Sequence, residues 1–593
     1  MVRDRRLARG GRALPVRRRH RPRGADRRGP RRAARRGRRT GLTLRAPPSA
    51  LFHVKHRPTA LPSGLFHVKH RPAPLHSPFH RPRKEPHVHA NDPVFRLGIT
   101  EPTAIDPYKA QEGEGILVCK ALFTGLLALD EDGVLIPATA RSWESDPTAT
   151  TWTFTLRPGT VFSNGEPVTA HSFVRGWARA LDPEANTETA YHLAGVRSFT
   201  AVDDTTLVVE LSEPDVQFDL KTLQPIFSPV PECAGPALNP AYNDLPVGNG
   251  PFKMAGPWEH GVAIRLERND LWAGPAPEVR EVQIDILDAV TGLDDEYERF
   301  LAGVYDYARI PPARTAEAAA LEGFLEQEGA GLFYLIPFCH QAPMDSLDAR
   351  RALSAAIDRQ GLIDTYFQGR RSAAHSLLSP WFGKAHTPLA ELQDDPDSGW
   401  SVYDPERARA AALRAGLGPG SRVEFAYNTG AGHDDWVKAL ARGLEEVLSW
   451  RVELLRTDAR GLVDHRTSIA AAGFCRAGWA CDYPTPDNML FPLLHSSCTA
   501  PDAEGTAHGD NEGRYVNPAF DALVARARAS TDPAERADAW RRADRTAMAD
   551  LALIPLWYRT DQRVHAAGRI TGLRIDFDGN PTLTTVKARK TTR

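Results

Sequence analysis

The sequence has no long apolar run. No stretch reaches the roughly 20 apolar residues that a transmembrane helix needs. The basic amino-terminal segment is not followed by the apolar core of about 7–15 residues that marks a secretory signal, and no Leu-x-Gly-Cys motif for lipid attachment is present. We therefore expect no membrane-spanning segment, and the sequence shows no export signal.

Signatures of catalysis and of phosphate binding are also missing. The chain contains no G-x-S-x-G nucleophile motif, no H-E-x-x-H zinc motif and no paired-carboxylate motif. The Gly-rich turn at residues 247–252 (VGNGPF) fits neither G-x-G-x-x-G nor a P-loop, which would need a Lys. We expect a protein that is not an enzyme and that needs no cofactor and no metal ion.

Cysteine is scarce. The six cysteines are Cys119, Cys233, Cys339, Cys475, Cys481 and Cys498. None of them forms a C-x-x-C pair, so zinc binding and thioredoxin-like redox chemistry are unsupported. One or two disulfides in an exported protein remain open, because the sequence does not assign their pairing.

The chain has no net charge, but this balance hides an asymmetry. Residues 1–90 hold 26 Lys and Arg against 3 Asp and Glu, an excess of 23 positive charges. Since the whole chain has 74 residues of each kind, residues 91–593 hold 48 basic and 71 acidic residues, an excess of 23 negative charges. An acidic folded part has no electrostatic reason to bind nucleic acid.

Residues 1–90 form an Arg- and Pro-rich leader of unusual composition. The octapeptide at residues 51–58 (LFHVKHRP) recurs identically at residues 65–72. A segment of this composition cannot bury a core, so we expect it to be disordered and the folded protein to begin near Asn91. Its Arg run could bind nucleic acid, and its paired histidines could bind metal.

A third hypothesis for the leader, which we favour, is translated intergenic DNA upstream of a misplaced start codon. The repeated Phe-His-Val-Lys-His can be encoded by TTT CAC GTG AAA CAC, which contains the palindrome TTTCACGTGAAA. That palindrome resembles the centromere-like site of bacterial chromosome-partition proteins. Mass spectrometry of the native protein should then place its amino terminus near residue 90, whereas peptides from residues 1–80 would contradict the hypothesis.

Beyond the leader, alternating segments predict strands and amphipathic segments predict helices. The expected strands lie at residues 94–99, 151–157, 205–211, 423–427 and 553–558, and the expected helices at residues 115–127, 347–359, 434–448, 519–528 and 534–550. Thr169 is expected to N-cap a further helix through Phe173 and Trp177. Asp358 and Arg359 are expected to form a surface ion pair.

Residues 476–488 (RAGWACDYPTPDN) are the most informative stretch. They bring Arg476, Trp479 and Asp482 together on a segment that turns at its prolines. A carboxylate in a closed cleft needs a cationic partner, because an unpaired buried charge is costly. The α-amino group of a peptide would be such a partner for Asp482. The alternative is that Arg476 and Asp482 only pair with each other.

This stretch resembles the ligand-binding segment of the family 5 extracellular solute-binding proteins, the oligopeptide-binding components of bacterial ABC importers. The family has an Asp in the context Arg-Ala-Gly-Trp-x-x-Asp-Tyr. Its signature Phe-x-Asp-Gly-x-Pro-Val-Thr-Ala-x-Asp is matched by Phe162, Gly165, Pro167, Val168, Thr169 and Ala170, while Asn164 and Ser172 replace the Asp positions. The helix at residues 347–359 and the turn at residues 247–252 also match, so the resemblance covers about residues 93–575.

The resemblance implies an α/β, bilobed periplasmic-binding-protein-like (Venus flytrap) fold with an extra subdomain in the first lobe. The implied division places the leader at residues 1–90 and lobe I at residues 91–331, with an inserted subdomain at about 124–245. Lobe II would occupy residues 332–556, and residues 557–593 would return to lobe I and form the carboxyl-terminal tail. Two lobes of this kind close over a ligand by a hinge.

The resemblance also implies which residues meet the amino end of a ligand. Asp482 corresponds to the family Asp that binds the ligand's amino terminus, and Trp479 is expected at the cleft. A family acidic residue that lines the ligand's path falls on Gln111, with Glu112 beside it.

Three further positions are implied to meet the carboxyl end. Arg476 and His433 match a family Arg and His that serve ligand carboxylates, and Arg466 matches a second Arg across a one-residue gap. Arg suits this role because its planar fork can bind a carboxylate through two hydrogen bonds. One anion at one end and cations at the other would complement a zwitterionic peptide.

The implied function is that of a substrate-binding protein of a peptide ABC transporter. It would be a monomer that captures short peptides and delivers them to the transmembrane subunits of an ABC permease, outside the cytoplasm. A cytoplasmic location remains an alternative, because no export signal is visible. A solute-sensing cytoplasmic regulator is another, although residues 1–90 contain no helix-turn-helix. A third alternative is a family member that binds a nickel chelate, an oligosaccharide or a signalling peptide. The presence of both Arg476 and Asp482 favours peptides as the ligand.

Overall fold

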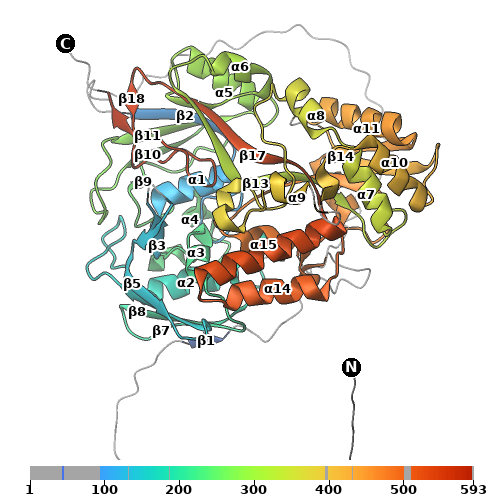
Figure 1. Ribbon diagram of the computed structural model, residues 1–593. Helices are drawn as coiled ribbons and strands as arrows, with labels where there is room; N and C mark the ends of the chain where they lie inside the picture. The colour runs from blue at the N-terminus through green and yellow to red at the C-terminus, as the bar shows by residue number, and fades with distance from the viewer. Residues whose placement is uncertain are drawn as a thin grey trace, which may run out of the picture. The chain divides into compact units, whose positions relative to one another are not determined.

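The structure of the protein is a computed structural model (Figure 1) that describes residues 43–45, 94–130, 133–185, 187–393, 395, 399–429, 432–499 and 509–589. The leader therefore lies outside the described residues except at β1 (Thr43–Arg45), and so do residues 91–93 at the expected start of the folded part. The predicted disorder and origin of the leader stay predictions.

A six-stranded mixed sheet is the frame of the candidate site. Its strand order is β12-β17-β13-β16-β14-β15. The bounds are Tyr307–Arg309 for β12, Ile554–His565 for β17, Phe324–Pro337 for β13, Phe474–Ala480 for β16, Arg422–Asn428 for β14 and Arg451–Thr457 for β15. The long strands β13 and β17 run antiparallel side by side (Figure 1), and their register breaks between Glu328 and Leu332. Before this break β17 pairs with β12, and beyond it β13 pairs with β16.

Two smaller sheets precede this frame in the chain. The four-stranded sheet has the order β2-β11-β10-β9, with bounds Val94–Thr100, Glu281–Leu287, Ala263–Arg268 and Phe252–Met254. The five-stranded sheet has the order β1-β7-β8-β6-β5. Its strands after β1 span Val196–Ala201 for β7, Thr206–Leu211 for β8, Thr151–Leu156 for β6 and Ala140–Ser145 for β5. Two hairpin-sized sheets pair β3 (Leu127–Leu129) with β4 (Leu135–Pro137) and β18 (Ile570–Thr571) with β19 (Lys587–Ala588).

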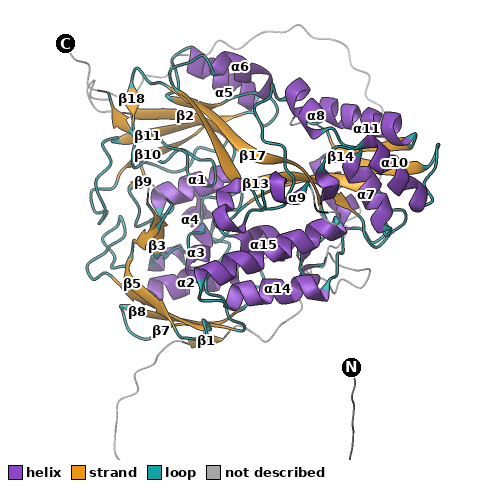
Figure 2. Ribbon diagram, viewed as in Figure 1, coloured by secondary structure: helices purple, strands orange, loops and turns teal. Residues whose placement is uncertain are grey.

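Helices pack against all three larger sheets (Figure 2). In the first part of the chain they are α1 (Gly113–Leu122), α2 (Ala170–Ala180), α3 (Phe218–Lys221), α4 (Pro240–Asp244), α5 (Gly292–Leu301) and α6 (Thr315–Ala318). In the second part they are α7 (Leu347–Ala355), α8 (Arg359–Tyr366), α9 (Leu389–Leu392), α10 (Pro405–Arg414), α11 (Asp434–Leu448), α12 (Ala459–Thr467), α13 (Pro486–Leu494), α14 (Pro518–Ala529) and α15 (Pro533–Asp550). The neighbouring helices α14 and α15 lie side by side.

Several predicted elements are confirmed, and one helix end is wrong. Helix α11 has the predicted bounds, and Thr169 is the N-cap of α2, where its N–H donates to Ser172 Oγ (3.2 Å). The helix predicted at residues 115–127 instead ends at Leu122. The Leu122 carbonyl accepts from the Gly250 N–H (2.8 Å), and a Cβ on Gly248 would lie 1.9 Å from the same oxygen. The Gly-rich turn therefore packs directly on the end of α1.

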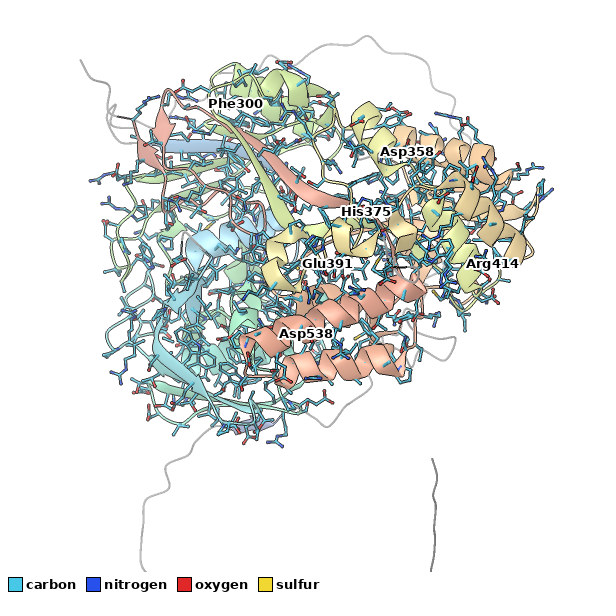
Figure 3. The ribbon with its side chains drawn as sticks, in the orientation of Figure 1. Phe300, Asp358, His375, Glu391, Arg414 and Asp538 are labelled. Carbon is cyan, nitrogen blue, oxygen red and sulfur yellow. The ribbon has the colours of Figure 1, made fainter. Side chains whose placement is uncertain are left out.

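The predicted surface ion pair of Asp358 and Arg359 is wrong, and so is the single helix at residues 347–359. Asp358, labelled in Figure 3, N-caps α8, because its Oδ1 accepts from the Gly361 N–H (2.9 Å). Arg359 is only 3% exposed and donates to the carbonyls of Pro555 and Ser401 (2.7 Å each). The break occurs because an Asp side chain that caps one helix ends the preceding one.

Three remaining expectations concern cysteines, membranes and metals. All six cysteines are free in the structure, so neither of the disulfides left open by the sequence is formed. No helix among the described residues combines the length and apolar character needed to cross a bilayer. Within the same residues, no group of three or more His, Cys, Asp or Glu side chains is arranged to hold a metal ion.

Candidate functional site

Residues 476–488 leave the six-stranded sheet as the end of β16, turn, and enter α13. Asn488, which is fully buried on α13, organises this turn. Its Oδ1 accepts from the Trp479 indole N–H (3.0 Å) and from the Asp482 backbone N–H (2.9 Å). Trp479 and Asp482 are therefore held by one amide side chain, and both remain partly exposed.

The Asp482 carboxylate is positioned through only one of its oxygens. Its Oδ2 accepts from Asn488 Nδ2 (3.0 Å) and from the hydroxyl of Tyr191, on the 3-10 turn Glu188–Leu193. Among the described residues, nothing donates a hydrogen bond to Oδ1 and no Lys or Arg forms an ion pair with Asp482. The site thus presents a carboxylate with one open oxygen and no cationic partner.

No sequence pattern pointed to Tyr191, which lies 291 positions from Asp482. Its neighbour His192 stacks on it with ring centroids 4.0 Å apart. Burial lowers the pKa of His192 to about 4, against the opposing field of Asp482. His192 is therefore neutral at pH 7 and supplies no positive charge to the carboxylate.

The edge of β16 next to Asp482 has no strand partner among the described residues. β14 pairs with β16 only through Phe425 with Phe474 and Ala426 with Cys475. From Arg476 to Ala480 the described residues pair with β16 only from the β13 side. The backbone of residues 476–480 is therefore open to an added extended chain, because each strand offers hydrogen-bonding groups on both edges.

Arg476 and Asp482 do not pair with each other, which removes that alternative. Arg476 Nε donates to Asn428 Oδ1 (2.8 Å) at the end of β14. No described Asp or Glu forms an ion pair with Arg476. Burial and the field of Arg466 lower the pKa of the Arg476 guanidinium. Arg476 is therefore a partly buried positive charge without a counterion.

His433 lies near Arg476 as a neutral imidazole rather than the cation that the sequence suggested. Its Nδ1 accepts from the Trp436 indole N–H (3.4 Å). Burial, aided by the fields of Arg476 and Arg371, lowers the pKa of His433 to about 4. It can serve a ligand carboxylate as a hydrogen-bond donor through its other ring nitrogen.

Arg466 already has an acidic partner. Its Nε lies 2.8 Å from Glu512 Oε1, and the Glu512 side chain is only 8% exposed. Burial raises the pKa of Glu512 to about 7, against the field of Arg466. Above that pH the pair is ionised, and Arg466 is then the least available of the predicted carboxylate-binding residues.

Gln111 and Glu112 make no direct contact with Asp482 within the described residues. Gln111 is exposed, and Glu112 Oε1 accepts from the Thr103 N–H (2.6 Å) just before α1. Among the described residues no hydrogen bond or ion pair joins either side chain to Asp482. Their ligand role stays a prediction that no contact supports.

Arg371 was missed by sequence reasoning, although it lies at the cationic end. Its guanidinium carbon lies 3.9 Å from the Phe367 ring centroid, 5.2 Å from that of Phe333 and 5.7 Å from that of Trp557. Among the described residues it has no ion pair and no hydrogen bond. Burial alone lowers its pKa to about 10. The double Arg at residues 370–371 gave no hint of which side chain turns inward.

A buried ion network lies beside the same turn. Lys221 Nζ lies 2.6 Å from Asp215 Oδ2 and 3.1 Å from Asp487 Oδ2, and Arg528 lies 3.4 Å from Asp487 and 3.6 Å from Asp215. Asp215 and Lys221 follow the five-stranded sheet, whereas Asp487 and Arg528 belong to α13 and α14. Burial opposes ionisation of Asp487, but Lys221 and Arg528 outweigh it and hold its pKa below the usual value.

A cavity of about 1220 Å³ lies away from this site, against α1 and the carboxyl-terminal segment. Lys120, Trp272, Trp381 and Asp576 are among its lining residues, and none of the seven predicted ligand residues lines it. Lys120 is paired with Asp576 (2.9 Å). Its lysine thus has an acidic partner, unlike Arg476 at the candidate site, which has none among the described residues.

These features define a solute-binding protein. The chain belongs to the bacterial extracellular solute-binding proteins, family 5, whose middle-region model matches residues 134–501. It is similar to the "Oligopeptide-binding protein OppA" of Bacillus subtilis, with 27% identity over 495 residues that cover 78% of this chain and 86% of the relative. It is also similar to the "Protein XP55" of Streptomyces lividans, with 29% identity over 510 residues that cover 82% and 86%.

Solved structures share the fold. One is the Haemophilus influenzae OppA complex with the peptide RPPGFSPFR, with a TM-score of 0.68, 23% identity, and coverage of 84% of this chain and 99% of that one. Another is the clavulanic acid biosynthesis oligopeptide binding protein 2, with a TM-score of 0.73, 22% identity and coverage of 84% and 96%. The predicted α/β, bilobed periplasmic-binding-protein-like fold is confirmed.

Proposed function

We propose that the chain is the substrate-binding protein of a peptide ABC transporter and that it binds short peptides along the open edge of β16. The observation that carries the proposal is the separation of charge. Within the described residues, Asp482 has an open oxygen and no cationic partner at one end of residues 476–482, and Arg476 has no acidic partner at the other. A zwitterionic peptide supplies both missing partners.

The length of the strand edge at residues 476–480 sets the length of the peptide that can bind there. Residues 476–480 span about 13 Å at about 3.3 Å per residue of extended chain. An extended ligand beside them advances at the same rate, so three to five residues fit between the two ends. Main-chain hydrogen bonds to a strand edge do not depend on the ligand's sequence, which gives the broad tolerance that a nutrient importer needs.

The remaining parts of the proposal extend this role. Lobe I at residues 91–331, with its insert at about 124–245, and lobe II at residues 332–556 would close about β13 and β17, where the register breaks. The protein would act as a monomer, outside the cytoplasm, and would pass its ligand to the transmembrane subunits of an ABC permease. It would carry out no reaction on the peptide.

The unfolding temperature in the presence of different ligands tests whether the protein binds peptides. Di- to pentapeptides should raise the unfolding temperature, since a ligand at 100 times its dissociation constant adds about 2.7 kcal/mol to the free energy of unfolding. Oligosaccharides and nickel chelates serve as controls in the same differential scanning experiment and should leave it unchanged. Stabilisation by a control ligand and by no peptide would replace the proposed function with another ligand class.

A further inference from the structure

Two guanidinium groups, not one, lack a counterion among the described residues at the end of the candidate site that is predicted to meet the ligand's carboxylate. Arg476 donates to the neutral Asn428, and Arg371 lies over the rings of Phe333, Phe367 and Trp557. Neither has an acidic partner in the described part of the chain. Arg466 differs, because Glu512 balances it.

The two groups lie on the same face of the sheet. Arg371 covers Phe333, which pairs with Gly478 across β13 and β16, and Gly478 lies two residues from Arg476. Residues two apart on a strand, and residues directly opposite on neighbouring strands, present their side chains on one face. Arg371 therefore lies over β13 and β17 on the face of the sheet that carries Arg476, one strand inward from β16, where it can meet a ligand side chain that projects over this face.

Aromatic contacts link Arg371 to His433, which is also predicted to meet the ligand's carboxylate. Trp557, under Arg371, packs edge-on against Trp436 with centroids 5.1 Å apart, and Trp436 packs against His433 at 5.9 Å. The fields of Arg371 and Arg476 both act on His433. His433, a neutral imidazole, is thus linked by packing to Arg371 and lies within the field of both positive charges.

Stacking alone does not account for the position of Arg371. Each guanidinium has five N–H donors, and burial without a protein acceptor removes part of their hydration. A free peptide carboxylate can neutralise one of the two charges, and the second charge still lacks a partner. A ligand with a second carboxylate near its carboxyl end supplies it.

We propose that Arg371 binds a second carboxylate of the ligand, so that the protein prefers peptides whose last residue is Asp or Glu. This inference rests on the proposed function and adds a specificity to it. The side-chain carboxylate of the last residue meets the Arg371 fork, while the terminal carboxylate meets Arg476. Asp482 then faces the ammonium group, and all three charges are matched.

Calorimetric titration of the full chain with Ala-Ala-Glu and Ala-Ala-Gln at pH 8 tests this preference, because the two peptides differ only in one charge. Wild type should bind Ala-Ala-Glu about 10- to 100-fold more tightly, the range of a hydrogen-bonded charge pair. Arg371→Gln should bring the two affinities within about threefold of each other, and Arg371→Lys should keep part of the ratio because it keeps the charge. Arg370→Gln is the matched control, since Arg370 points to Glu326 (3.3 Å), and it should keep the wild-type ratio.

The outcomes separate this inference from the function on which it rests. Equal affinities in wild type would overturn the second carboxylate site and leave peptide binding intact. A loss of affinity for both peptides by the same factor in Arg371→Gln would also overturn it, because a guanidinium that only covers the aromatic rings acts on every ligand alike. Failure of wild type to bind either peptide would overturn the inference and the proposed function together.

Discussion

Replacing Asp487 by Ala should lower the free energy of unfolding by about 3–5 kcal/mol, the cost of removing one member of a buried ion pair. Asp487 is 2% exposed and lies between Lys221 and Arg528, so its loss leaves two cations to share Asp215. The midpoint of urea denaturation measures the effect. The network joins Asp215 and Lys221, which follow β8, to Asp487 on α13 and Arg528 on α14. The variant should therefore also loosen the packing between these two parts of the chain beside Asp482.

A control variant and a compensating second substitution test whether the loss of stability comes from the buried ion network. Asp538→Ala removes an exposed carboxylate from α15, labelled in Figure 3, and should change stability by no more than about 0.5 kcal/mol. Adding Lys221→Met to Asp487→Ala removes the uncompensated cation and should restore part of the loss. If Asp487→Ala behaves like Asp538→Ala, the network contributes nothing to stability.

Lowering the pH should remove the stability that Asp487 contributes to the wild-type protein. The pKa of Asp487 is held below its usual value, so its contribution is present above about pH 4, the value for an unfolded Asp. The contribution disappears as the pH falls through the lowered pKa of the folded state.

Local patterns located several of the regular elements, although they did not predict β13, β16 or α8. The amphipathic pattern of residues 434–448 predicted both bounds of α11, and the Thr169 cap placed the start of α2. These signals lie within a few residues of the element that they define. The end of α1 was missed, because it is set by Gly248 and Gly250, which lie more than a hundred residues further along the chain.

Most of the site's surroundings depend on contacts that no local pattern reports. Arg359 looked like a surface residue beside Asp358, yet its partner is the carbonyl of Pro555, 196 positions away. Tyr191 reaches Asp482 from a part of the chain with no ligand motif. Resemblance to a family located Asp482 and Arg476, but it could not show that Arg466 is neutralised or that Arg371 turns inward.

Asp482→Asn should weaken binding of a free tripeptide by about 2–5 kcal/mol, or roughly 30- to 5000-fold. The substitution keeps the shape of the side chain and its neighbours Tyr191 and Asn488 but removes the negative charge that faces the α-ammonium. Asp464→Asn is the matched control, because Asp464 is exposed and pairs only with Arg460 (3.0 Å), and it should bind as wild type does.

Calorimetric titration of wild type and Asp482→Asn with Ala-Ala-Ala and N-acetyl-Ala-Ala-Ala tests the central claim most directly. Acetylation removes the ammonium, so wild type should bind the free peptide far more tightly than the acetylated one, and the variant should discriminate much less between them. If Asp482→Asn binds the free and acetylated peptides in the same ratio as wild type, the amino-terminal anchor lies elsewhere, and the assignment of this site is contradicted.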